Sequence, residues 1–416
     1  MRTIFGCTAL ALLFGLLGCG KSPDVPPDPG PPPLEWSNDM QTLADGNNRF
    51  ACDLYGKLRE DEKGNLFFSP YSVHTALSMT ATGAKGNTRA EMVKVLHLPA
   101  DEGKVLASGD LGRFYGHPRT DYEFSVANAL WGQKGFPWRP EWLAVQNDRF
   151  GAGFQEADFA ANPDAERQRI NRWVEEKTRD KIKELLEPPH VTSRTTIVLT
   201  NAIYFKGKWA EQFDPKKTRD GTFRLADGTT KTVPMMRKSE GKFRYGRTDD
   251  KANWDDGVQI LELPYKGDEL AMVVILPPKP DGLRAVEKQL TAENLTKWLG
   301  GLKDLELDVS LPRFRMETKA ELIKKLIALG MIDAFDGNAD FTGMSTTSPG
   351  FISAVVHKAF VDVNEEGTEA AATAVVIGEL SSDRVKPSFV ADHPFLFLIR
   401  DVKHGTILFL GRVEKP

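Results

Sequence analysis

Cysteine is scarce in this sequence. Only three of the 416 residues are cysteines, and two of them, Cys7 and Cys19, lie in an N-terminal leader. The folded region therefore retains Cys52 alone and cannot form an internal disulfide. Cys52 lies in a segment with a helical apolar stripe, so we expect it to be a small core residue.

The sequence also lacks the short motifs of common enzymes. HExxH, CxxC, GxSxG and GxxxxGK[ST] are absent. Residues 239–242 match SxxK, but the partner motifs SDN and KTG are missing, and the charged, glycine-containing setting predicts a loop. The seven histidines have no metal-ligand spacing, and His357 lies in an apolar strand, where a structural hydrogen bond is expected. We expect no catalysis, no metal and no cofactor.

A strong charge excess and a flexible linker are missing as well. The net charge is −4, which does not favour binding to a phosphate backbone, so we expect no nucleic-acid partner. Residues 35–416 contain no Ser/Gly-rich linker, charge block or low-complexity run. The length would allow more than one domain, but a single large domain with a substantial core is the simpler interpretation.

A long apolar run occurs at the N-terminus. Residues 4–17 follow Arg2 and are too few to span a bilayer comfortably, which predicts a secretory signal over residues 1–18. The run ends in Leu16-Leu17-Gly18-Cys19. This resembles a bacterial lipobox, in which the cysteine is lipidated and becomes the mature N-terminus. We predict that lipid on Cys19 anchors the protein to a bacterial membrane; the alternative is an ordinary signal with a chance cysteine.

Residues 19–35 form the predicted linker between this lipid and a domain at residues 36–416. Seven prolines lie between Lys21 and Pro33. Such a segment favours polyproline II and acts as a semi-rigid spacer. Gly20 rather than aspartate follows the cysteine, and in lipoproteins this indicates the outer membrane. We expect an exported protein that faces the periplasm or the cell surface.

Helix signals dominate the first part of the domain and strand signals the later part. Helices are predicted over residues 39–59, from Ser69-Pro70 to Gly83, from Asn162-Pro163 onward and over 318–329. Strands are predicted at residues 197–205, 258–264, 270–276, 305–311, 354–364, 394–399 and 407–413. This is an α+β pattern rather than a regular alternation.

Residues 365–378 fit neither class well. The alanines favour a short helix, whereas Val375-Val376-Ile377 favours a strand, and residues 378–388 are polar without a period. We therefore predict an exposed loop between two strands. With a period of two, one face carries small side chains that could enter a sheet without a clash. These are Thr368, Ala370, Ala372, Ala374 and Val376.

Five segments, in order, resemble the serpin family over roughly residues 38–413. They are residues 65–72 (NLFFSPYS), 83–88 (GAKGNT), 199–209 (LTNAIYFKGKW), 364–376 and 389–397 (FVADHPFLF). The resemblance implies the serpin fold: helices packed on a large central mixed β-sheet, two smaller sheets and an exposed reactive-centre loop. It also implies a monomer.

The resemblance implies an irreversible, suicide-type inhibitor of serine-type endopeptidases. In this family the protease cuts the loop and forms an acyl-enzyme, and the cut loop then enters the main sheet as a new strand and distorts the protease. The alternative is a non-inhibitory serpin that acts as a surface-binding or structural lipoprotein. Bulky or charged residues on the inserting face would favour that alternative, and this chain has small ones.

The hinge of the loop is implied to be Gly367, Thr368, Glu369, Ala370, Ala371, Ala372, Thr373 and Ala374, with one alanine fewer than many inhibitory members. Matching the loop places the bait residue at Leu380, whereas counting from Gly367 places it at Ser381, with Ser382 after the cut. We prefer the Leu380–Ser381 bond, which suits chymotrypsin-like, elastase-like or subtilisin-like proteases. Arg384 is a later alternative for trypsin-like proteases.

Two polar clusters are also implied by the resemblance. The first, which the family calls the shutter, lies where the main sheet parts and comprises Ser69, Ser72, Asn201 and His357. The second, the breach, lies where insertion starts and comprises Trp209, Arg313 and Glu365. An ion pair between Arg313 and Glu365 is expected from the match.

Overall fold

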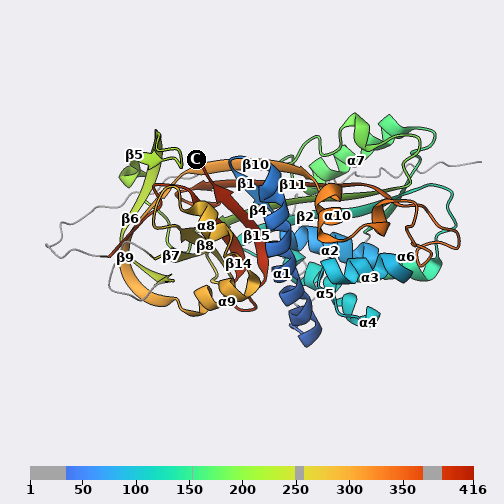
Figure 1. The fold of residues 1–416 in the computed structure, drawn as a ribbon, viewed down its shortest axis with the longest axis horizontal. Helices are drawn as coiled ribbons and strands as arrows, with labels where there is room; N and C mark the ends of the chain where they lie inside the picture. Colours follow the sequence, from blue (N-terminus) through green and yellow to red (C-terminus); the bar gives the residue numbers. More distant parts are fainter. Residues whose placement is uncertain (1–33, 152, 249–256, 369–386) are drawn as a thin grey trace, which may run out of the picture. The chain divides into compact units, whose positions relative to one another are not determined.

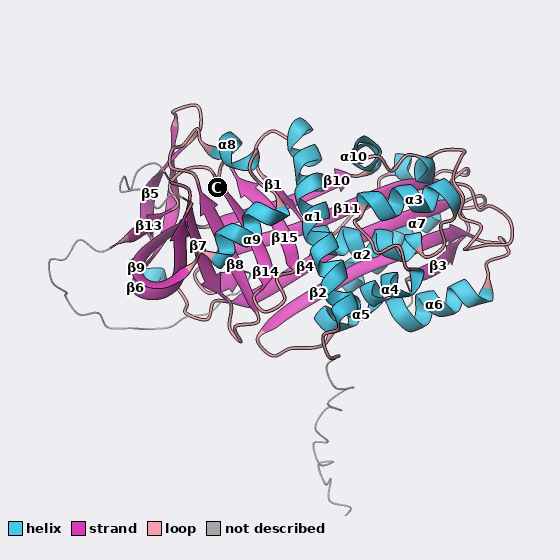
Figure 2. Ribbon diagram, turned by 60° about the horizontal axis from the view of Figure 1, so that its bottom comes forward, coloured by secondary structure: helices cyan, strands magenta, loops and turns pink. Residues whose placement is uncertain are grey.

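Helices pack around two β-sheets in the computed structural model, which describes residues 34–151, 153–248, 257–368 and 387–416 (Figures 1 and 2). The helices are α1 (Asn38–Asp61), α2 (Pro70–Ala81), α3 (Gly86–Val95), α4 (Glu102–Val105), α5 (Ala107–Gly116), α6 (Pro140–Phe150), α7 (Pro163–Lys177), α8 (Leu283–Glu287), α9 (Ala292–Gly300) and α10 (Ile323–Leu329). Short 3-10 turns are η1 (Pro188–His190), η2 (Pro215–Lys217) and η3 (Asp333–Phe335). None of the helices in these ranges is long and apolar enough to cross a membrane.

The six-stranded sheet has the order β10-β11-β12-β4-β2-β3. Its strands are β2 (Tyr122–Gln133), β3 (Phe154–Ala157), β4 (Ile197–Lys208), β10 (Phe314–Glu321), β11 (Ile352–Asn364) and β12 (Gly367–Thr368). Strand β4 is an apolar run because both of its faces are covered. Ile197, Leu199, Ile203 and Phe205 face the main core, whereas Val198 and Ala202 pack in a second core beneath α7.

The other sheet has nine strands in the order β1-β15-β14-β8-β7-β6-β9-β13, with β5 paired to β6. They are β1 (Leu66–Phe68), β5 (Arg219–Arg224), β6 (Thr230–Arg247), β7 (Gln259–Pro264), β8 (Leu270–Leu276), β9 (Lys303–Pro312), β13 (Ser388–Val390), β14 (Phe395–Asp401) and β15 (Ile407–Val413). The two smaller sheets that the family resemblance implies are thus continuous in the described residues. The long strand β6 joins them, because one end pairs with β5 and the other with β7.

Helix α2 is central to the site. Ser69 caps its N-terminus by accepting a hydrogen bond from the Ser72 backbone N–H at 3.1 Å, and Pro70 occupies the first turn. All twelve residues of α2 are buried, since it packs against β2, β4 and β15. The helix start predicted at Ser69-Pro70 is correct.

Two local predictions were wrong. Residues 318–321 complete strand β10 instead of starting a helix, because they pair with β11, and α10 begins only at Ile323. Residues 239–242 lie within β6, at a register shift between Lys238 and Gly241, rather than in a loop. Strand β2 was not predicted, since polar residues such as Ser125 and Asn128 interrupt its apolar pattern.

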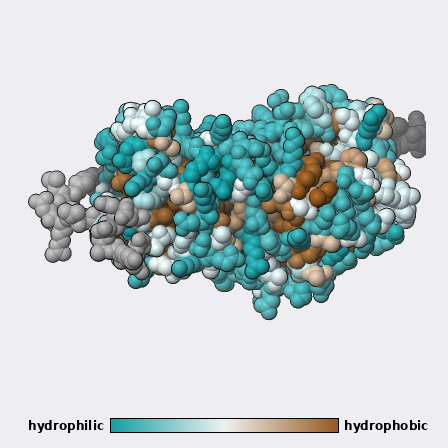
Figure 3. Space-filling model, in the orientation of Figure 1, coloured by the Kyte–Doolittle hydropathy of each residue, from teal (hydrophilic) through white to brown (hydrophobic). Residues whose placement is uncertain are grey.

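Most of the face seen in Figure 3 is hydrophilic, and apolar side chains gather near α10. Ile327 and Ile332 are 40% and 47% exposed there. Exposed apolar side chains in small numbers are normal on a folded protein. The cores lie beneath this surface, and Cys52 belongs to the main one, as predicted.

Candidate functional site

Strands β4 and β11 separate at one end to admit the two-residue strand β12. The two strands are parallel and pair directly from Ile352 with Ile197 to Phe360 with Tyr204. Beyond that point β12 lies between them, with Thr368 opposite both Gly207 of β4 and Val363 of β11. We call this position the fork. It holds Gly367 and Thr368, the first two residues of the predicted hinge, within the sheet.

The predicted breach residues meet at the turn that leads into β12. The indole N–H of Trp209 donates to the Asn364 carbonyl at 2.9 Å, and its backbone N–H donates to the Glu366 carbonyl at 2.8 Å. Arg313 binds the Glu365 carboxylate through Nε at 2.8 Å and Nη2 at 2.6 Å. The expected ion pair is therefore present and fixes the turn from β11 to β12.

Glu365 is charged although it is only 4% exposed. Burial alone would raise its pKa, but hydrogen bonds from Arg313 and from the Thr218 hydroxyl outweigh burial and hold the pKa below the ordinary value. The turn therefore depends on a carboxylate that remains ionised in mildly acidic solution.

The shutter residues also meet. Asn128, Asn201 and His357 lie opposite one another on β2, β4 and β11. The amide of Asn201 donates to the Ser72 hydroxyl and to the Asn128 side-chain oxygen, and the Asn128 amide donates to the Ser72 carbonyl at 3.0 Å. Asn128 was not predicted, because the strand that carries it was not recognised. This network ties the middle of the sheet to α2.

The tautomer of His357 follows from its partners. The Ser69 backbone N–H, which can only donate, points to His357 Nε2 at 3.0 Å. Nδ1 must then carry the proton, which it donates to the Asn201 side-chain oxygen. Burial of the ring lowers the pKa of His357 to about 3. The ring is neutral and part of the network, as expected of a structural histidine.

The far end of the loop is fixed at β13. This strand pairs in parallel with β9, and Ser388 lies opposite Asp308. Two residues after the end of β13, Asp392 accepts two hydrogen bonds from the Arg224 guanidinium at 3.0 and 2.8 Å. Burial would raise the pKa of Asp392, but bonds from His393 and Arg224 hold it below its ordinary value. Both ends of the loop are thus attached to strands.

Several predicted site residues lie outside the described residues. They are the remaining hinge residues Glu369 to Ala374, the bond candidates Leu380, Ser381, Ser382 and Arg384, and the lipidation candidate Cys19. The site that the structure describes is therefore the fork, the breach and the shutter.

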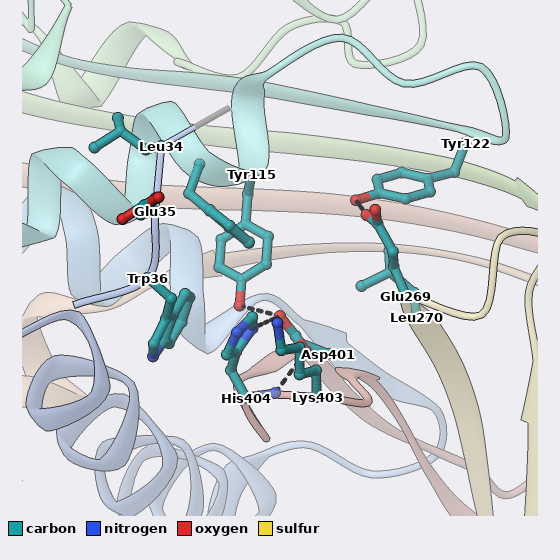
Figure 4. A pocket seen from close by; sticks show the side chains of 11 residues that line it. Leu34, Glu35, Trp36, Tyr115, Tyr122, Glu269, Leu270, Asp401, Lys403 and His404 are labelled. Carbon is teal, nitrogen blue, oxygen red and sulfur yellow. Dashed lines mark hydrogen bonds and ion pairs between the residues drawn. The ribbon is translucent and has the colours of Figure 1, made fainter. Parts of the chain in front are cut away.

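A cavity of about 410 Å³ lies near the start of α1 (Figure 4). Trp36 stacks on His404 at 3.8 Å, and Asp401 accepts hydrogen bonds from the Tyr115 hydroxyl and from His404 Nδ1, both at 2.9 Å. These groups satisfy one another and hold Trp36 against the domain. None of the predicted site residues lines this cavity.

Comparison with known proteins agrees with this geometry. Residues 45–416 match the family model described as Serpin (serine protease inhibitor). The leukocyte elastase inhibitor of Bos taurus is 44% identical over 386 residues, and Serpin B8 of Homo sapiens is 43% identical over 388; each alignment covers 91% of this chain and 100% of the relative. The chain belongs to the serpin family.

Solved structures of the family have the same fold. Uncleaved ovalbumin matches with a TM-score of 0.80 at 31% identity, covering 90% of this chain and 100% of ovalbumin. Serpin48 of the insect Tenebrio molitor matches with a TM-score of 0.80 at 30% identity, covering 92% and 100%. The fold predicted from the sequence is thus confirmed.

Proposed function

We propose that this chain is an irreversible, single-use inhibitor of serine-type endopeptidases that traps its target as an acyl-enzyme by inserting the cut loop into the six-stranded sheet. The observation that carries the proposal is the fork. The hinge already occupies the space between β4 and β11, and Thr368 is fully buried there. Insertion of the loop would extend a strand that exists.

The register of β12 defines how such an extension would run. If Thr368 stays opposite Gly207 and Val363, residues 369–378 would pair with β4 from Lys206 down to Ile197. Ala374 would then lie level with Asn201 and His357, so insertion must break the bond between those two side chains. Side chains that alternate with Thr368 would enter the main core, and Ala370, Ala372 and Ala374 are small enough to do so.

The relative named above as the leukocyte elastase inhibitor of Bos taurus suggests the target class. Leu380 would fill an apolar specificity pocket of an elastase-like, chymotrypsin-like or subtilisin-like protease. The test is to mix the full chain with a panel of these proteases and look for a complex that survives denaturant. A panel in which every protease cuts the loop and remains active would favour the non-inhibitory alternative.

We predict that the inhibited protease cuts after Leu380. Mass spectrometry of the released C-terminal peptide should then find Ser381 at its start. A peptide that starts at Ser382 would instead support Ser381 as the bait residue. A peptide that starts at Val385 would support Arg384 and a trypsin-like target.

We also propose that residues 1–18 are a signal peptide and that lipid on Cys19 attaches the domain to a bacterial membrane through the proline-rich linker at residues 19–35. The support is the Leu16-Leu17-Gly18-Cys19 pattern at the end of the apolar run. The variant Cys19→Ala should leave the membrane fraction of the producing cells. Cys52→Ala is the matched control and should fractionate as the parent does, since Cys52 is buried. An unchanged distribution of Cys19→Ala would reject the anchor.

A further inference from the structure

A tyrosine from the other sheet contacts the hinge at the fork. Tyr265 follows β7 and is fully buried, and its hydroxyl lies 2.7 Å from the Thr368 hydroxyl. Either oxygen can be the donor. Thr368 is the last residue described before the loop, so this hydrogen bond acts on the hinge where an inserted strand would continue.

The tyrosine ring is held rigidly. It stacks on Trp209 with the centroids 4.8 Å apart and an interplanar angle of 11°, and its contact with Phe205 is edge-on at 5.0 Å. Trp209 is the residue that binds the Asn364 and Glu366 carbonyls of the hinge turn. The turn and the Thr368 side chain are therefore fixed by two stacked rings.

The backbone around this contact leaves no room for larger residues. A Cβ on Gly207 would lie 3.0 Å from Tyr265 Cδ1, and a Cβ on Gly367 would lie 2.0 Å from the Gly207 carbonyl oxygen. Glycine at both positions lets the tyrosine ring and the hinge approach β4 closely. The contact depends on a site that is shaped for it.

We propose that Tyr265 is a positioning residue whose hydroxyl holds Thr368 within the fork, so that insertion begins from a hinge already paired with β4 and β11. This rests on the proposed trapping function. Without the bond, a larger fraction of molecules would have the hinge outside the sheet when the protease cuts the loop. Insertion would start later, and more acyl-enzyme would hydrolyse before it is trapped.

The test is Tyr265→Phe in the full chain, which removes the hydroxyl and keeps the ring. One buried hydrogen bond corresponds to about three- to tenfold in the equilibrium constant between the paired and the unpaired hinge. The number of inhibitor molecules consumed per protease should therefore rise by up to about tenfold, while the cut bond is unchanged. Tyr115→Phe is the matched control, because it also removes a buried tyrosine hydroxyl, one that is bonded to Asp401 and not to a hinge residue.

The direction of the change in inhibitor consumption distinguishes a loss of positioning from a general loss of stability. A domain that is merely weakened would open its sheet more readily and trap at least as well, whereas loss of positioning traps less. Thr368→Val should raise consumption as Tyr265→Phe does, and the double variant should add nothing further, because both remove the same bond. Additive effects, or an equal rise in Tyr115→Phe, would overturn the proposal.

Hydrogen exchange gives a readout that does not depend on inhibition. The backbone amides of residues 207–209, which pair with the hinge or its turn, should exchange faster in Tyr265→Phe and Thr368→Val than in the parent and in Tyr115→Phe. If the parent traps no protease, the proposed function fails, and faster exchange in these two variants would still support the contact. Unchanged exchange together with unchanged consumption would reject it.

Discussion

Replacing Thr368 with arginine should convert the inhibitor into a substrate. The Thr368 side chain is fully buried against Tyr265, so Thr368→Arg would place an unpaired charge in the interior. Such a charge costs about 3 kcal/mol or more, which corresponds to a roughly 100-fold slower insertion. The substitution leaves the proposed bait at Leu380 unchanged, so the protease should still cut the loop and then escape.

The measurement is a gel of denatured mixtures together with residual protease activity. The variant should give cut inhibitor and active protease in place of a stable complex. Heat stability gives a second readout, since the cut parent should gain stability on insertion and the cut variant should gain less. Ser388→Arg is the matched control, because Ser388 lies on the exposed side of β13 at the other end of the loop. Equal trapping by Thr368→Arg and the parent would leave reversible loop binding as the better account.

The sequence was most informative where a motif spans a whole element. The segment from Leu199 to Trp209 predicted a central strand, and β4 is that strand. Both faces of β4 are buried, so its residues form a continuous apolar run. Such a run can be recognised from neighbouring residues alone. Residues 318–321 gave a misleading signal, because their pairing with β11 overrides a helix-like pattern. Boundaries that depend on such long-range pairs could not be read from the sequence.

The candidate site also contains residues that motifs predicted and residues that only the long-range packing brings in. Trp209, Arg313 and Glu365 were named from motifs, and the structure brings them together. Asn128 and Tyr265 were not named, because each belongs to a segment without a motif and reaches the site only through packing. The position of Gly367 and Thr368 within the sheet was also beyond the sequence. This position depends on whether the end of β4 near Gly207 pairs with β12 or with β11. Strand β4 is distant in the chain from both, so the sequence does not show which pairing forms.

Acid should weaken the sheet at the shutter before it affects the breach. Burial lowers the pKa of His357 to about 3 and that of His74 to about 4. Both folded-state pKa values lie below the ordinary histidine pKa of about 6.5. Between each folded-state pKa and about pH 6.5 the unfolded chain therefore binds more protons than the folded chain. The free energy of unfolding thus falls as the pH is lowered below about 6.5. At pH 5 each histidine should reduce the free energy of unfolding by about 2 kcal/mol relative to neutral solution. Glu365, whose pKa is held below its ordinary value, stays ionised there.

Protonation of His357 and of His74 should disrupt different contacts. Protonated His357 cannot accept from the Ser69 N–H, so acid breaks the network that loop insertion must also break. His74 binds the Leu96 carbonyl, away from the fork. Urea unfolding from pH 5 to 7.5 should show a flatter pH dependence in both His357→Gln and His74→Gln. We also expect acid to speed insertion of the uncut loop in the parent, which is measured as a gain in heat stability together with a loss of inhibition. Only His357→Gln should lose this effect of acid. If His74→Gln suppresses that acceleration equally, the effect is global destabilisation and the shutter is not the acid-sensitive element.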